Sequence, residues 1–201
     1  MSSPSMALSW LAAVAVTGTA SANFAGFTVT STVTPAGNTQ FKVFATFSTA
    51  NNVVLNVFSV NRTAGSLNAA LWCDDPTQQE SCWLPQGSSQ QPSYVTICGG
   101  TGVALDPGNP GDSTSLPSGW YDSTPGTSNT ASTGMGGGLF GCLIAQVTQS
   151  ALSTCTHTAS VTYKVAGTTT PLFGSGTFTV PAPGALTTLL AAGTLRRRRR
   201  R

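Results

Sequence analysis

Charge is the scarcest property of this sequence. Charged side chains make up 7% of the 201 residues, against about 25% in an average soluble protein. The chain has one glutamate, two lysines and one histidine. This scarcity excludes a protein built on exposed amphipathic helices, because their solvent faces need closely spaced Glu, Lys and Arg. A single histidine also leaves few ways to build a hydrolase around a Ser–His or Cys–His pair.

Positive charge is confined to the C-terminal end. Three basic and six acidic side chains are spread over the rest of the chain. The other six basic residues form one terminal run, Arg196, Arg197, Arg198, Arg199, Arg200 and Arg201. A nucleic-acid-binding protein distributes its basic residues over a folded face, among aromatic side chains. We therefore expect no nucleic-acid partner.

Hydroxyl side chains, glycine and proline are abundant instead, with 54 Ser and Thr and 34 Gly and Pro. Thr, Val and Phe favour strands. Polar and apolar residues alternate, or apolar residues cluster, in seven short segments: residues 27–34, 41–48, 53–60, 94–98, 139–147, 160–165 and 176–180. This pattern predicts an all-β protein with a single antiparallel β-sandwich or jelly-roll domain over residues 23–179.

Polar segments connect the expected strands. Residues 35–38 and 49–52 have the composition of tight turns. Residues 74–92 and 107–138 are rich in Gly, Pro, Ser, Thr, Asn and Gln, and we expect them to be long polar loops. Loops of this length are typically functional or disordered.

The first 22 residues are typical of a secretory signal peptide. Residues 8–16 are apolar, Gly18 follows them, and Ala20 and Ala22 supply the small side chains that a signal peptidase requires. No Lys or Arg precedes the apolar stretch, so only the amino terminus is positively charged there. The pattern predicts export, with cleavage before Asn23.

A second processing segment spans residues 180–201. Val180, Pro181, Ala182 and Pro183 precede an apolar run over residues 186–195 and then the arginines. A helix over residues 183–195 is about 20 Å long, against a hydrocarbon core of about 30 Å. The arginines favour the cytoplasmic side of the membrane. We therefore expect a short hydrophobic helix that anchors the precursor transiently in the inner membrane.

This C-terminal arrangement resembles the PEP-CTERM sorting signal of bacterial surface proteins, in the variant with Ala182 in place of glutamate that planctomycete proteins carry. The resemblance implies cleavage near the motif by an exosortase, a membrane cysteine transpeptidase. It further implies that the chain is the substrate of that enzyme, and that the mature protein is at the cell surface or in the extracellular matrix.

The region between the two processing segments resembles a group of planctomycete secreted proteins that carry the same signal. The matching segments are residues 41–45, 54–58, 93–97, 119–121 and 173–180. That group has no assigned activity, so the resemblance implies a location and no chemistry.

Five cysteines in an exported chain predict disulfide bonds. Sequence proximity favours the pairs Cys73–Cys82 and Cys142–Cys155, with Cys98 left as a buried strand residue. Other pairings remain open, because connectivity does not follow from sequence. The absence of a C-x2-C pair and the single histidine speak against a zinc site.

Aromatic residues at the margins of the long loops suggest an alternative function. They are Trp72, Trp83, Trp120 and Tyr121. Exposed on loops, such rings would stack on sugars, and the protein would be a secreted carbohydrate-binding module with an exopolysaccharide as its partner. Core packing is the competing interpretation of the same tryptophans.

Other polar residues give weak signals for a metal or for catalysis. Asp106, Asn109 and Asp112 are oxygen ligands spaced along one loop, as calcium requires, but Asp-Pro and Asn-Pro are also ordinary turn formers. We interpret His157 as a partly exposed strand residue. We therefore predict no catalytic residue, no cofactor and no enzyme activity.

Overall fold

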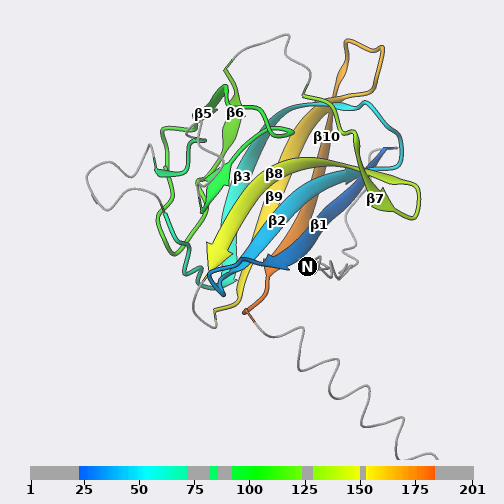
Figure 1. The fold of residues 1–201 in the computed structure, drawn as a ribbon. Helices are drawn as coiled ribbons and strands as arrows, with labels where there is room; N and C mark the ends of the chain where they lie inside the picture. Colours follow the sequence, from blue (N-terminus) through cyan, green and yellow to red (C-terminus); the bar gives the residue numbers. More distant parts are fainter. Residues whose placement is uncertain (1–22, 72–81, 86–91, 124–128, 150–152, 184–201) are drawn as a thin grey trace, which may run out of the picture.

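Two antiparallel sheets face each other in a β-sandwich (Figure 1). The computed structural model describes residues 23–71, 82–85, 92–123, 129–149 and 153–183. These residues form ten strands and no helical element, so the predicted all-β class is confirmed. The signal segment with Ala20 and Ala22, the apolar run, and the arginines at positions 196–201 lie outside the described residues.

The first sheet, sheet A, has the strand order β1-β2-β8-β4, and β7 also pairs with β8. All of its pairings are antiparallel. Its strands are β1 (Phe24–Val33), β2 (Thr39–Phe47), β4 (Tyr94–Val95), β7 (Thr133–Gly136) and β8 (Leu139–Gln149).

The second sheet, sheet B, has the order β10-β9-β3-β6-β5 and is likewise antiparallel. Its strands are β3 (Val53–Gly65), β5 (Val103–Leu105), β6 (Trp120–Asp122), β9 (Cys155–Lys164) and β10 (Pro171–Val180).

The stretch 107–138, predicted to be one long loop, contains two short strands. β6 pairs with β3, and β7 pairs with β8. Trp120 and Tyr121 give β6 a high β propensity, whereas the two glycines of β7 do not favour a strand. Pairing with the long strands supplies the hydrogen bonds of both. The predicted turns at 35–38 and 49–52 are confirmed. Gly37 N donates to Thr34 O, and Asn52 Nδ2 donates to Thr49 O.

A cluster of aromatic rings joins the two sheets. From sheet A, Phe24 and Phe27 pack edge-on against each other with ring centroids 5.3 Å apart. Phe27 meets Phe178 of β10 at 5.4 Å, and Phe47 of β2 meets Tyr163 of β9 at 4.9 Å. All five side chains are buried. Edge-to-face pairs add about 0.5–1.5 kcal/mol each beyond their burial.

A bulge directs both phenylalanines of β1 into the core. The pairing of β1 with β2 shifts between Phe24 and Gly26, and Gly26 has a φ of 119°. Residues three apart on a regular strand point to opposite faces. The extra residue of the bulge brings Phe24 and Phe27 to the same face.

Glycines on β10 make room for these rings. A Cβ atom added to Gly174 would lie 2.3 Å from Cδ1 of Phe24, and one added to Gly176 would lie 3.2 Å from Cδ2 of Phe27. The inner face of β10 opposite β1 is therefore backbone, and the two strands approach closely.

We predict that Gly174→Ala lowers the free energy of unfolding by about 1–3 kcal/mol, because the added methyl group overlaps the Phe24 ring. Gly134→Ala on β7 is the matched control: a Cβ there meets nothing within 4 Å, and we expect a change within about 0.5 kcal/mol. Urea denaturation followed by tryptophan fluorescence measures both. Equal stabilities of the two variants would contradict the proposed packing.

Candidate functional site

The C-terminal motif begins inside the sandwich. Val180, the last residue of β10, is fully buried and pairs with Cys155 of β9. Beyond it, Ala182 N donates to Oγ1 of Thr154 at 3.0 Å. The described chain ends at Pro183, three residues beyond the end of β10, at the edge of the molecule (Figure 1). The motif is thus bonded, as far as Ala182, to β9 and to the residue that precedes it.

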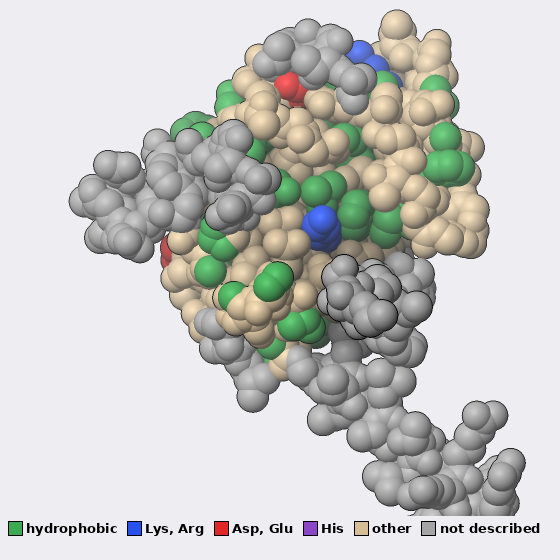
Figure 2. All heavy atoms as spheres, in the orientation of Figure 1, with side chains coloured by type: hydrophobic (Ala, Val, Ile, Leu, Met, Phe, Trp, Pro, Cys, Tyr) green, Lys and Arg blue, Asp and Glu red, His purple; other side chains and the backbone are tan. Residues whose placement is uncertain are grey.

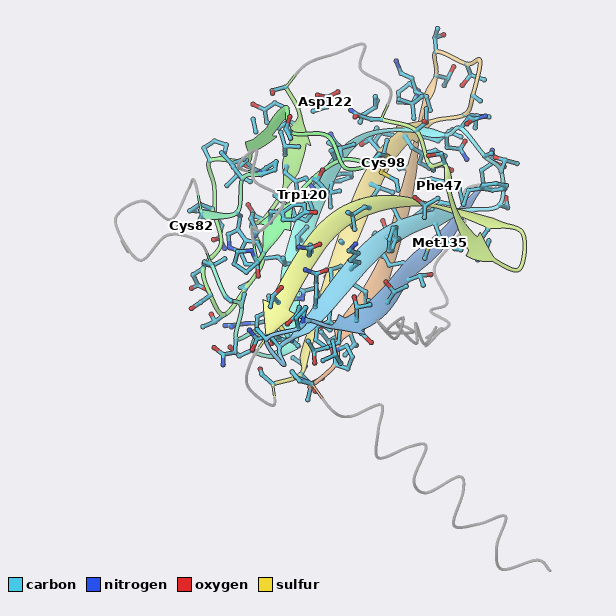
Figure 3. All side chains as sticks on the ribbon, in the orientation of Figure 1. Phe47, Cys82, Cys98, Trp120, Asp122 and Met135 are labelled. Carbon is cyan, nitrogen blue, oxygen red and sulfur yellow. A yellow bond between two sulfur atoms is a disulfide. The ribbon has the colours of Figure 1, made fainter. Side chains whose placement is uncertain are left out.

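Two of the four aromatic residues predicted to bind sugars lie in the core. Trp83 is fully buried, and Trp120 is 1% exposed, with its Nε1 donating to Thr96 O at 3.0 Å (Figure 3). Both rings belong to the buried core, as the competing core-packing interpretation expects, so neither is exposed to stack on a sugar. Trp72 lies outside the described residues. Tyr121, adjacent to Trp120 on β6, points to the opposite face and is 46% exposed.

The side chains proposed for calcium bind their own loop. Oδ1 of Asp106 accepts from Gly108 N, and Oδ1 of Asn109 accepts from Gly111 N, each at 3.0 Å. Oδ1 of Asp112 accepts from the backbone N of residues 114 and 115. These are turns closed by Asx side chains. Within the described residues, no group of three or more His, Cys, Asp or Glu side chains is placed to hold a metal.

The disulfide within sheet A differs from the prediction. Cys142 of β8 bonds to Cys98, whose backbone N donates to Leu143 O. The predicted Cys142–Cys155 bond is wrong, because Cys155 lies on β9 in the other sheet and is free and buried. Cys82 is also disulfide-bonded, whereas Cys73, its predicted partner, lies outside the described residues. Disulfides are compatible with an exported protein.

Cys155 and His157 form a buried pair on β9. The Sγ atom lies 3.8 Å from both ring nitrogens, and the imidazole stacks on Phe178 with centroids 5.5 Å apart. His157 is fully buried, so its interpretation as partly exposed is wrong. Burial and then the Arg62 guanidinium lower its pKa from 6.5 to about 4, and burial raises the pKa of the Cys155 thiol. Both groups are neutral at neutral pH.

An exposed aromatic surface lies on the outer face of sheet B. Phe173 of β10 is 60% exposed, and its ring meets that of Phe58 on β3 edge-on at 6.3 Å. Phe58 and Tyr121 line a groove of about 270 Å³ that also includes Asn56 and Asp106. We call Phe58, Tyr121 and Phe173 the aromatic strip. Sequence reasoning found only Tyr121 of the three, because alternation alone does not distinguish the outer face from the core.

The molecule is poor in charge on the face of sheet A as well. Figure 2 shows isolated blue and red side chains on a described surface that is otherwise uncharged.

The described part of the chain contains no helix that is long and apolar enough to cross a membrane. No family model, curated protein or solved structure matches the chain in comparisons with known proteins.

The buried histidine predicts acid sensitivity. The pKa of His157 is lower in the folded state than its ordinary 6.5, so the unfolded chain binds the proton more tightly. This contribution to stability is therefore full above pH 6.5 and falls by up to about 1.4 kcal/mol per pH unit towards pH 4. His157→Gln removes the titration and should flatten the profile in that window. Urea denaturation at several pH values tests this. Parallel profiles for the two proteins would contradict it.

Proposed function

We propose that the protein is an exported cell-surface or extracellular-matrix protein whose C-terminal segment is cleaved by an exosortase. Signal peptidase and the exosortase are its processing partners, and the precursor is anchored transiently in the inner membrane. The two terminal segments of the sequence support this proposal. The disulfides are consistent with it, since they form in oxidising compartments.

The position at which β10 ends is the structural observation that best supports cleavage near the motif. The sandwich closes with the buried Val180, and the last described contact of the chain with β9 is the hydrogen bond from Ala182. A cut after Pro183 therefore removes no strand, no core side chain and no hydrogen bond of the described domain. A cut within the motif would break only the Ala182 bond. All ten strands of the described domain lie before residue 184.

The arginines act as the topological stop in this proposal. Each costs about 2.5–3.5 kcal/mol at the centre of a membrane helix, so six of them resist translocation. The apolar residues 186–195 include threonines, and alone they hold the precursor weakly. Retention should therefore depend on the charged end, and release on the cut.

No catalytic activity is part of the proposal. The one histidine lies in the core beside a neutral thiol, and the carboxylates of residues 106 and 112 close turns of their own loop. The alternative function, a carbohydrate-binding module on the loops, is weakened because Trp83 and Trp120 are buried and cannot contact a sugar. Only Tyr121 of that set is exposed among the described residues.

We predict that replacing the six arginines with serine releases uncut precursor into the periplasm or medium. Replacing all six with lysine is the control, and it should restore retention because it keeps the charge. Immunoblots of membrane, periplasm and medium show the distribution. Retention of the serine variant in the membrane would contradict the proposed stop.

We predict that Pro181→Ala with Pro183→Ala leaves full-length precursor in the membrane fraction. Pro35→Ala, in an exposed turn, is the matched control and should be processed normally. Mass spectrometry of the secreted protein locates its C-terminus. A wild-type secreted product that still ends at Arg201 would refute cleavage at the motif.

A further inference from the structure

Four strands of sheet B place their residues in one row across its outer face. Phe173 of β10 is opposite Thr162 of β9, which is opposite Asn56 of β3, which is opposite Tyr121 of β6. Cross-strand partners project from the same face of a sheet. With strands about 4.8 Å apart, the row from Phe173 to Tyr121 is about 14 Å long.

The row has an exposed aromatic ring at each end. Phe173 is 60% and Tyr121 is 46% exposed. They are two of the three large hydrophobic side chains exposed in the described part of the chain, and the third, Val33, lies on β1 of the other sheet. Phe58 contacts Phe173 and lines the groove beside Tyr121. The three rings thus form one continuous surface.

The groove depends on a close approach of two backbones. Gly119 precedes β6, and a Cβ atom there would lie 2.9 Å from Val57 O and 3.3 Å from the Cα of Phe58. The glycine lets the chain lie flat against β3, so that Tyr121 and Phe58 border the groove. Its remaining wall comes from the loop that contains Asp106 and Pro107.

Uncharged polar groups lie between the rings. Oδ1 of Asn56 accepts from Thr162 N at 3.3 Å, and its Nδ2 has no hydrogen-bond partner among the described residues. The Ser160 and Ser175 hydroxyls lie 2.8 Å apart in the next row. Among the described residues that line the groove there is no basic side chain, and Asp106 supplies the one carboxylate.

We propose that the aromatic strip and its groove bind a neutral polysaccharide. A pyranose ring presents C–H groups on its faces and hydroxyls at its rim. The rings of the strip offer apolar faces to the former, and the amide, hydroxyl and carboxylate groups offer donors and acceptors to the latter. An anionic ligand is disfavoured because no cation lines the groove. A wholly apolar partner would leave Asn56 unpaired.

Affinity electrophoresis of the secreted protein tests this proposal, with hydroxyethylcellulose, xyloglucan and galactomannan as neutral probes and heparin as the charged probe. We expect retardation by at least one neutral polysaccharide and none by heparin. The Tyr121→Ala, Phe173→Ala double variant should bind that polysaccharide at least tenfold more weakly. Val33→Ala, which removes an even more exposed hydrophobic side chain from sheet A, should bind within twofold of wild type.

The Asn56→Asp variant distinguishes the loss of a contact with the polysaccharide from a loss of folded structure. The substitution keeps the acceptor for Thr162 N and replaces the Nδ2 donor with an acceptor. We expect a threefold or greater loss of affinity with an unchanged circular dichroism spectrum and melting temperature.

Three results would overturn the proposal. One is that no neutral probe retards the wild type, and another is that the double variant binds as well as wild type. The third comes from sedimentation equilibrium: a wild-type dimer that the double variant converts to a monomer, with retardation unchanged, would make the strip a contact between copies. None of these results depends on C-terminal cleavage, so the proposal fails or survives independently of the processing pathway.

Discussion

The packing of β1 against β10 is the contact on which the rest of the sandwich depends. Phe24 and Phe27 reach from sheet A to Tyr163 and Phe178 of sheet B. They fit because the inner face of β10 carries glycine opposite them. Protein cores are packed nearly as densely as crystals, so each phenylalanine ring of β1 needs a glycine opposite it on β10 to fit. A Cβ atom at Gly174 would overlap the Phe24 ring, and one at Gly176 would press against the Phe27 ring.

The same strand connects this contact to both proposed functions. Because side chains alternate along a strand, Phe173 and Ser175 lie on the outer surface when the glycines face the core, and Phe173 is part of the aromatic strip. Further along, the buried Val180 completes the domain, and Ala182 is fastened to Thr154. Closure of the sandwich, one end of the aromatic strip and the exit of the C-terminal segment therefore all depend on β10 and the two residues that follow it.

The sequence predicts the class of the fold well and the site poorly. Alternation in β2 identifies a strand, because Phe41, Val43 and Phe47 are buried core residues at alternate positions along it. The bulge at Gly26, which has a positive φ, reverses which residues of β1 face the core. The alternation of apolar and polar residues does not predict such a bulge. Cys98 and Cys142 are 44 residues apart, so proximity along the chain favours the wrong partner for Cys142. The strip is assembled from β3, β6 and β10, and only their pairing brings Phe58, Tyr121 and Phe173 together.

Hydrogen exchange of the secreted protein, followed by mass spectrometry, tests most directly the claim that β10 completes the domain. Backbone amides exchange slowly when their strand opens only with the whole fold. The account predicts that the amides of residues 174–180 that donate to β9 are protected as strongly as the amides of their β9 partners after residues 184–201 have been removed. Exchange of this segment as fast as the exposed turn at 166–170 would contradict it, because β10 would then be a loose edge whose glycines do not close the sandwich.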